Sequence, residues 1–299
     1  MTGGILLVDK PQGVTSHDVV ARARRLLGTR KVGHAGTLDP MATGLLLLGV
    51  DSATRLLTYL VGLDKEYLAT IRLGVATDTD DAEGEVVATT DASGVPDAAV
   101  AAGILALTGA IRQVPSTFSA IKVDGRRAYD RARAGEAVEL AARSVTVHAF
   151  ELLASRREGA VVDLDVRVAC SSGTYVRALA RDLGAGLGVG GHLTALRRTR
   201  VGPFGVADAV QLPDPREHPD AAAPALLDAA DVAAQLFPVV RLDADQTRDL
   251  AHGKRVELAE PDVDLAAALT PEGRLAALIE LRRGRARVLL GLPTSEVLP

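Results

Sequence analysis

Apolar and polar residues alternate along several stretches of the chain, which is the pattern of a β-strand with one buried face. Between residues 66 and 74, every second side chain is apolar: Tyr67, Ala69, Ile71 and Leu73. Residues 160–169 alternate in the same way, and Ile5–Val8 and Ser119–Val123 fit two further strands. The apolar run Leu45–Leu48 must be buried as well. These stretches predict a sheet whose strands pack one face against a core.

Three segments between these stretches have the features of helices. Ser16 can cap a helix over residues 16–27, because a serine side chain accepts a hydrogen bond from a free backbone N–H. Pro96 suits the start of a helix that runs to about residue 107. A third helix is expected over residues 174–183.

Strands and helices follow one another without a regular β-α-β rhythm, which predicts an α+β fold. We expect a larger domain over residues 1–237, with a mixed, mainly antiparallel sheet flanked by helices. Residues 212–225 are rich in proline and polar residues, typical of a linker or surface excursion, and a helix over residues 226–236 follows. Residues 238–299 show a strand, a helix and further strands, and predict a small β-rich domain.

The composition is that of a globular protein of 299 residues, 47 % of them hydrophobic. Cys170 is the single cysteine, so an intramolecular disulfide and a cysteine-bound zinc cluster are excluded and a reducing cytoplasm is expected. No run of about 18 apolar residues is present, and the first residues lack the basic segment of a signal peptide. We therefore expect a cytoplasmic protein without a membrane partner.

The formal net charge of −4 argues against indiscriminate binding of nucleic acid. Basic residues nevertheless gather in clusters: Arg22, Arg24 and Arg25; Arg30 and Lys31; Arg126 and Arg127; and Arg197, Arg198 and Arg200. Separate basic patches on an acidic protein suit a shaped RNA partner better than uniform contact with a nucleic-acid backbone. Ordinary solvated arginines are the alternative for any single cluster.

Residues 33–46, GHAGTLDPMATGLL, carry the strongest candidate for chemistry. Pro40 disfavours a helical conformation at Asp39, and the surrounding glycines allow tight turns. A carboxylate on such a loop is suited to catalysis, because catalytic groups concentrate on loops held by a rigid scaffold. Composition alone favours a simpler interpretation, in which Asp39 caps a helix or a turn.

Two other motifs lack the context that their chemistry needs. GLGVGG at residues 186–191 follows a predicted helix rather than a strand, so a helix end and a turn are expected there instead of a dinucleotide site. The acidic residues between 78 and 85 lack the glycine and glutamate of an EF-hand calcium loop. No metal site is expected at His34, because companion ligands at suitable spacing are missing from the neighbouring sequence.

Five further segments accompany GHAGTLDPMATGLL in order: ILLVDKPQGVTSHDVV, DKEYLATIRLGVATDTDDAEGEV, QVPSTFSAIKVDGRRAYDRARAGE, CSSGTYVRALARDLGAGLG and HLTALRRTRVGPF. Together they resemble the bacterial tRNA pseudouridine-55 synthases of the TruB type over residues 4–205. The resemblance implies that residues 238–299 form a PUA-like RNA-binding domain, although the sequence match there is weak. The chain departs from the usual family residues at Ser116, Phe118 and Ser172.

The resemblance implies roles for six residues. Asp39 corresponds to the catalytic nucleophile, and Arg177 corresponds to an arginine that pairs with it. Such pairing lowers the pKa of a carboxyl group, so we expect Asp39 to be held ionised. The residues expected to bind the substrate are His34, Tyr67, Tyr175, Arg177 and Leu196, with Tyr67 stacked on the target base. One acid of the loop at residues 78–85 is expected to orient an arginine.

The implied reaction is the isomerisation of uridine to pseudouridine at position 55 in the T arm of tRNA, after the base is flipped out. It needs no cofactor and no metal, and the implied partner is tRNA, bound by a monomer without a guide RNA. Three alternatives remain open: a guide-dependent pseudouridine synthase, a tRNA-folding chaperone that performs no chemistry, and an enzyme acting on small nucleosides.

Overall fold

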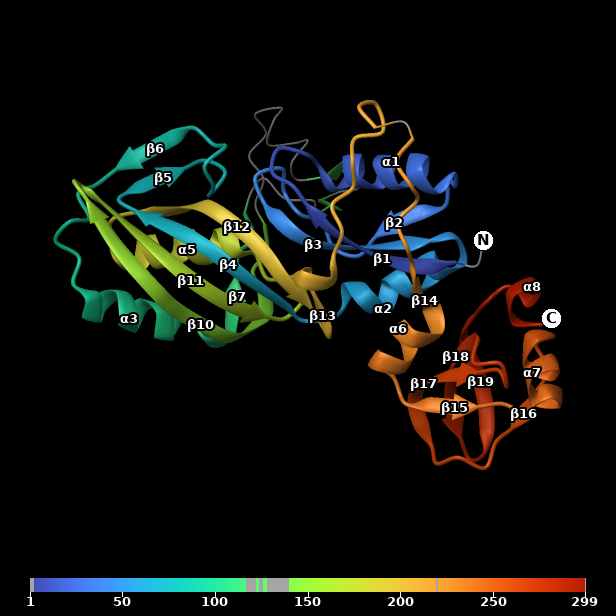
Figure 1. The fold of residues 1–299 in the computed structure, drawn as a ribbon. Coiled ribbons are helices and arrows are strands. Elements are labelled where there is room, and N and C mark those ends of the chain that lie inside the picture. The colour runs from blue at the N-terminus through green and yellow to red at the C-terminus, as the bar shows by residue number, and fades with distance from the viewer. Residues whose placement is uncertain (1–2, 117–121, 124–125, 128–139, 219, 299) are drawn as a thin grey trace.

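The computed structural model describes residues 3–116, 122–123, 126–127, 140–218 and 220–298. It is an elongated molecule with one large sheet and, at its C-terminal end, a separate small sheet (Figure 1). The strands of the large sheet are β1 (Gly4–Lys10), β2 (Val32–His34), β3 (Thr43–Val50), β4 (Lys65–Leu73), β7 (Gly109–Gln113), β10 (Arg143–Glu158), β11 (Val161–Cys170), β12 (Gly191–Val201), β13 (Phe204–Gly205) and β14 (Leu227–Asp228).

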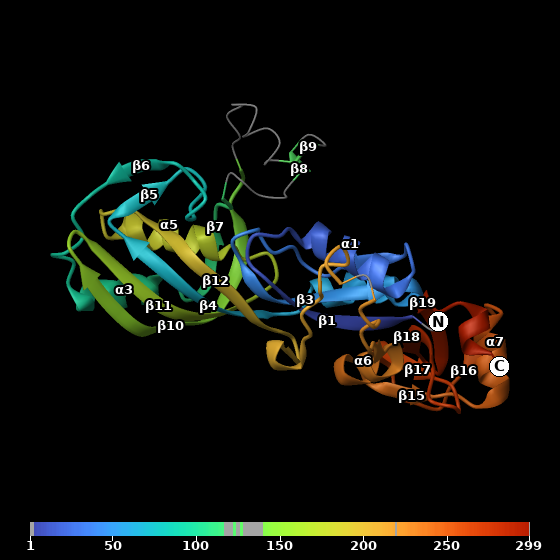
Figure 2. The same ribbon diagram turned by 45° about the horizontal axis from the view of Figure 1, so that its top comes forward.

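Helices and short hairpins surround this sheet (Figures 1 and 2). The helices are α1 (Ser16–Leu27), α2 (Leu57–Val61), α3 (Asp97–Ala106), α5 (Val176–Gly186) and α6 (Ala229–Leu236), with 3-10 turns η1 (Asp51–Leu56) and η2 (Val206–Asp208). The hairpins pair β5 (Val75–Thr77) with β6 (Val86–Thr89), and β8 (Lys122–Val123) with β9 (Arg126–Arg127).

The strand order is β14-β1-β3-β12-β4-β11-β10-β7, and the neighbours are antiparallel except for β3 and β12. The prediction of a mixed, mainly antiparallel sheet is confirmed. In the parallel pair, Arg197 lies opposite Thr43 and Arg198 opposite Gly44. Gly44 has φ +101°, and a Cβ there would lie 2.2 Å from the Arg198 carbonyl oxygen. Only glycine therefore lets β12 approach the end of the GHAGTLDPMATGLL motif this closely.

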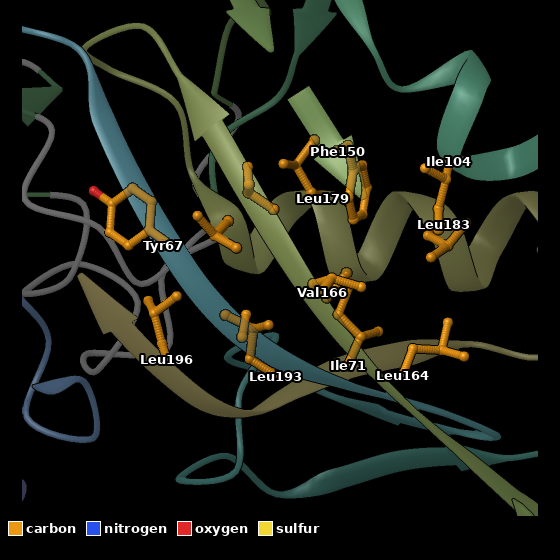
Figure 3. Close-up of a cluster of buried hydrophobic side chains, with 14 of the residues drawn as sticks. Tyr67, Ile71, Ile104, Phe150, Leu164, Val166, Leu179, Leu183, Leu193 and Leu196 are labelled. Carbon is orange, nitrogen blue, oxygen red and sulfur yellow. The ribbon is translucent and has the colours of Figure 1, made fainter. Parts of the chain in front are cut away.

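Alternation in β4 and β11 directs one set of side chains into a core beneath α5 (Figure 3). Ile71, Leu164 and Leu193 are fully buried there and pack with Leu179 of α5. Tyr67 lies at the end of this same buried row, with its hydroxyl pointing away from the other labelled side chains (Figure 3). The core therefore fixes the ring of Tyr67 and leaves its polar end beside the pocket described below.

The predicted helices and strands are found, with shifts at their ends. Thr15, not Ser16, caps α1 by accepting a hydrogen bond from the Asp18 backbone N–H. The third helix, α5, begins at Val176 with Tyr175 as its cap residue, and the glycine-rich segment after it forms a turn into β12. Of the strand predicted at Ser119–Val123, residues 119–121 lie outside the described residues.

The C-terminal sheet has the order β15-β17-β18-β19-β16. Its elements are β15 (Val239–Arg241), α7 (Ala244–Ala251), β16 (Val256–Glu257), β17 (Val263–Leu269), β18 (Leu275–Arg282), β19 (Arg285–Gly291) and α8 (Thr294–Val297). Leu269 and Leu278 share one core cluster with Val232 of α6 and with Ile5 of the large sheet. The small sheet is therefore packed on the rest of the chain through α6.

Candidate active site

Asp39 lies on the loop that joins β2 to β3. The Leu38 backbone is held on both sides by Ser16, whose hydroxyl accepts a hydrogen bond from Leu38 N–H at 2.8 Å and donates one to Leu38 C=O at 3.0 Å. The Asp39 carbonyl oxygen accepts a hydrogen bond from the Ala42 backbone N–H, which closes a turn. The loop continues into the strand β3, so Asp39 does not cap a helix, whereas the turn that the alternative interpretation expected is present.

Arg177, in the first turn of α5, joins Asp39 to the acidic loop between β5 and β6. Its Nε lies 3.1 Å from Asp39 Oδ2, and its Nη1 lies 3.4 Å from Asp81 Oδ2. Nη1 also donates a hydrogen bond to the Thr79 carbonyl oxygen at 2.8 Å. The side chain of Arg177 is only 5 % exposed, whereas that of Asp39 is 38 % exposed. One guanidinium thus orients a carboxylate that remains open to a ligand.

The electrostatics at Asp39 differ from the expectation. Loss of hydration raises the pKa of the Asp39 carboxyl group above its usual value, and the charge of Asp81 raises it further. Arg177 opposes this shift by its charge and its hydrogen bond, but the net direction is upward. Arg177 thus acts in the predicted direction, but desolvation outweighs it, so the pKa of Asp39 lies above the ordinary carboxyl value rather than below it.

Asp39 opens into a pocket of about 290 Å³ between the β2–β3 loop, β4, β12 and the segment that leads into α5. Its lining residues are Gly36, Thr37, Leu38, Asp39, Val61, Lys65, Tyr67, Ser171, Ser172, Gly173, Thr174, Tyr175, Val176, Arg177, Leu196 and Arg198. The structure therefore brings together five of the six predicted residues from four separate parts of the chain: Asp39, Tyr67, Tyr175, Arg177 and Leu196.

His34 is the predicted residue that does not line this pocket. It lies in β2, with its ring edge-on to His17 at a centroid distance of 5.5 Å. Burial lowers the pKa of His34, and the charges of His17 and Arg198 lower it further. Its Nδ1 atom is buried without a hydrogen-bond partner among the described residues. A neutral imidazole is therefore favoured beside the Asp39 loop.

Gln113, at the end of β7, is a residue that the sequence interpretation missed. It is 1 % exposed, and its side-chain amide accepts a hydrogen bond from the Tyr175 N–H at 2.8 Å and donates one to the Tyr175 C=O at 3.1 Å. These two bonds fix the backbone from which α5 starts, and hence the approach of Tyr175 and Arg177 to the pocket. No local pattern signals this contact, because the residues are far apart in sequence.

Lys65 also contributes to the pocket wall and was missed. Its ammonium group donates hydrogen bonds to the Val61 and Leu63 carbonyl oxygens and to the Ser172 hydroxyl. Burial, and to a lesser extent the charge of Arg198, lower the pKa of Lys65 to about 8. A signal was present, because Lys65 shares the buried face of β4 with Tyr67.

Two of the three departures from the usual family residues, Ser116 and Ser172, have structural partners here. The Ser172 hydroxyl donates to the Val61 carbonyl oxygen at 2.7 Å. The buried Ser116 hydroxyl donates to Asp80 Oδ2 at 2.7 Å, and the same carboxylate pairs with Arg181. Phe118 lies outside the described residues.

The predicted basic cluster at residues 197–200 and one arginine of the cluster at residues 22–25 are engaged within the protein. Arg197 pairs with Asp9 and Arg200 with Glu66, while Arg198 is buried. Arg22 pairs with Asp214. These arginines are therefore not free positive patches.

Within the described ranges, no group of three or more His, Cys, Asp and Glu residues is arranged to hold a metal ion. No helix in the same ranges is both long and apolar enough to cross a membrane.

Comparison with known families identifies the chain. Residues 24–176 match the N-terminal domain of the TruB family of pseudouridylate synthases. Residues 177–220 match a tRNA pseudouridylate synthase B C-terminal domain, and residues 237–293 match the C-terminal region of tRNA pseudouridine synthase II. The chain belongs to the TruB family of pseudouridylate synthases. It is therefore an enzyme of the isomerase class, as predicted.

Relatives cover nearly the whole chain. The tRNA pseudouridine synthase B of Leifsonia xyli subsp. xyli is 59 % identical over 98 % of this chain and 98 % of its own length. That of Thermobifida fusca is 57 % identical over 95 % of this chain and 96 % of its own. Among solved structures, an archaeal box H/ACA sRNP Nop10-Cbf5 complex matches with a TM-score of 0.70 and 25 % identity, covering 99 % of this chain and 88 % of that chain. Members of the TruB family thus share this fold with chains found in larger assemblies.

Proposed function

We propose that this chain converts uridine 55 in the T arm of tRNA to pseudouridine, with Asp39 as its catalytic carboxylate. Its close relatives carry names that specify tRNA as the substrate. The observation that carries the proposal is the pairing of Asp39 with the buried Arg177 inside a pocket that Tyr67 also lines. An oriented carboxylate and an aromatic surface suit a flipped nucleotide.

The reaction exchanges one bond to C1′ of the ribose for another. The C1′–N1 bond of uridine breaks, a C1′–C5 bond forms, and the hydrogen of C5 is replaced while N1 gains a proton, so neither oxidant nor water is consumed. Tyr67 would stack on the extruded base, and Tyr175 and Leu196 would border it. Asp39 would act on the ribose or the base as nucleophile, or as a base, and each role requires its ionised form.

The chain is expected to work as a monomer without a guide RNA. Support comes from relatives that match over nearly their whole length and are named as tRNA enzymes. The matching chains in the solved H/ACA particles are only about one quarter identical to this chain, which is less than half the identity of those relatives. We expect the chain to act in the cytoplasm, where tRNA is found.

Tritium at C5 of uridine provides the test, because this hydrogen is lost when C5 bonds to C1′. The purified chain alone should release tritium from an unmodified T-arm stem-loop, and the same RNA with cytidine at position 55 should remain silent. Release only after addition of a second RNA would support a guide-dependent enzyme instead. Binding to tRNA without any release would support a chaperone that performs no chemistry. Turnover of free uridine would support an enzyme acting on small nucleosides.

We further propose the division into a catalytic domain, residues 1–237, and a PUA-like RNA-binding domain, residues 238–299. Arg283 and Arg285 lie at the exposed turn between β18 and β19, and their side chains form no ion pair within the described part of the chain. Such residues suit phosphate contacts, which position RNA and make binding salt-dependent. Truncation is a poor test, because the small sheet shares a core with α6. Charge reversal of both arginines should raise KM for full-length tRNA and leave kcat unchanged.

A further inference from the structure

Arg198 on β12 is a buried arginine that the reaction outlined above does not use. It is only 1 % exposed and lines the pocket, whereas the side chain of its neighbour Arg197 is 40 % exposed and pairs with Asp9. Alternation along the strand explains the contrast, because successive residues point to opposite faces. The two adjacent arginines therefore form a natural comparison.

Neutral oxygen atoms surround the Arg198 guanidinium. Its Nε donates to the Leu45 carbonyl oxygen at 2.7 Å, and its Nη2 donates to the Gly36 carbonyl oxygen at 3.0 Å. Arg198 also lies directly opposite Tyr67 in the antiparallel pairing of β12 with β4, and both side chains line the pocket. Among the residues that the structure describes, it forms no ion pair with a carboxylate. A buried charge without a counter-ion is costly, so its retention calls for a role beyond packing.

These neighbours of Arg198 belong to the groups proposed to meet the nucleotide. Gly36 precedes Asp39 on the β2–β3 loop, and Leu45 follows it at the start of β3. One planar guanidinium therefore spans both ends of the loop that carries Asp39, and its cross-strand partner is Tyr67. Lysine could not replace it, because an ammonium group on a flexible stem lacks the rigid fork of donors.

We propose that Arg198 is a positioning residue that fixes the Tyr67 ring and the Asp39 loop relative to each other. The inference rests on the proposed roles of Asp39 and Tyr67. The stacked base and the carboxylate must meet the same nucleotide, so a change in the separation of these two groups misplaces the reacting atoms. The positive charge also acts on the pocket, because it contributes to the lowered pKa values of Lys65 and His34.

The kinetic test compares Arg198→Lys with the matched control Arg197→Lys on the same strand. A misplacement of about 1 Å can lower a rate about 100-fold, so kcat per folded molecule of Arg198→Lys should fall by about that factor. Arg197→Lys should keep kcat within about twofold. Tm of both variants separates the loss of folded enzyme from the loss of rate. An unchanged kcat in folded Arg198→Lys would overturn the proposal.

A spectroscopic test reports the geometry without catalysis. The chain has four tyrosines and no tryptophan, so 3-fluorotyrosine labelling gives a simple ¹⁹F spectrum in which Tyr67→Phe identifies the Tyr67 signal. That signal should shift in Arg198→Lys and stay in place in Arg197→Lys. An unmoved Tyr67 signal in Arg198→Lys would refute the contact even if wild-type turnover confirms the proposed function.

If Arg198→Lys does not fold, Tyr67→Phe tests the contact from the other side. It removes the hydroxyl and leaves the buried charge and the ring in place. The Nε–H signal of Arg198 in the ¹⁵N spectrum should then shift, and a fixed signal would contradict the proposal. A wild-type protein that forms no pseudouridine would instead disprove the proposed function, while both spectra would still test the contact.

Discussion

Arginine and carboxylate side chains meet both in the pocket around Asp39 and on the outer face of the large sheet. On that outer face, Arg72 forms two hydrogen bonds to Asp163, and Arg156 pairs with Asp165. These pairs lie on the face of β4 and β11 that points away from α5, and their side chains are partly exposed. The two regions use the same pair of chemical groups in different surroundings.

The surroundings reverse the effect on the carboxyl group. Hydrogen bonds from Arg72 lower the pKa of Asp163, and those from Arg156 lower the pKa of Asp165. In the pocket, desolvation raises the pKa of Asp39 even though Arg177 lies beside it. An arginine neighbour therefore does not by itself fix the direction of the shift. Its hydrogen bonds are the largest effect at Asp163 and Asp165, whereas at Asp39 desolvation, together with the charge of Asp81, outweighs it. Strongly perturbed pKa values occur often at functional sites, so the raised pKa of Asp39 supports the role proposed for it.

The largest effect is expected from Asp39→Asn, which keeps the shape of the side chain and removes its charge. Turnover should fall by several orders of magnitude, because the variant has no carboxylate to react. RNA binding should change by less than about tenfold, or roughly 1.4 kcal/mol. Single-turnover tritium release and a binding titration measure the two quantities. Substantial turnover by the purified variant would remove Asp39 from the catalytic role.

Arg177→Lys should have the next largest effect, although it conserves charge. A lysine cannot contact Asp39, Asp81 and the Thr79 carbonyl oxygen at the same time. Loss of the fixed contacts would misplace the Asp39 carboxylate, and a misplacement of about 1 Å can cost about 100-fold, so kcat/KM should fall by about that factor. The matched control is Arg72→Lys on the outer face, for which the rate should not change. An equal rate in both variants would show that the buried pair has no special role.

Tyr67→Leu should weaken binding of the T-arm stem-loop by about 1–3 kcal/mol, the contribution of one stacked base. Tyr67→Phe should retain that binding, because the ring remains. The comparison is made by measuring Kd for the same RNA with both variants. If phenylalanine and leucine bind equally well, stacking on Tyr67 is the wrong explanation.

The pH dependence of kcat tests the raised pKa of Asp39 directly. Activity requires the ionised carboxyl group, so it should be lost as the pH falls through the pKa of Asp39 in the folded protein. Since that pKa lies above the ordinary carboxyl value, the acid limb should appear at a higher pH than a normal aspartate would give. The rate should fall about tenfold for each pH unit below the limb. A limb at the ordinary value would mean that Arg177 outweighs desolvation.

The sequence was a good guide to elements whose signal is local. The alternation from residue 66 to residue 74 predicted β4, and helix signals predicted α1 and α3 within a residue or two. The sequence analysis missed the strand β17 (Val263–Leu269), because its alanines are weak strand formers. Its pairing with β15 is parallel, so a short hairpin turn could not signal it either. Local periodicity does not show which strands will become neighbours.

The candidate site shows the same limit. Motif resemblance identified Asp39 and Arg177, but Gln113 was invisible because it acts only on a backbone 62 positions away. The sign of the pKa shift at Asp39 was also missed, because desolvation depends on what packs around the loop. Residues that contact the substrate can be found from a motif, whereas residues that hold them in place emerge only from the fold.

The smallest effect is expected where the outer ion pairs are broken. Arg72→Met keeps the aliphatic stem and removes the bidentate bond to Asp163, so the free energy of unfolding should fall by about 0.2–1 kcal/mol at neutral pH. Added salt should reduce this difference between variant and wild type, because exposed charges are screened. The lowered pKa of Asp163 gives the sign at acid pH: its stabilisation is present above the unfolded value and disappears as the carboxyl group is protonated in the folded protein. The variant and the wild type should therefore converge in stability at acid pH while kcat stays equal at neutral pH. A fall in kcat for Arg72→Met would mean that the outer face reaches the pocket after all, and the contrast between the two regions would fail.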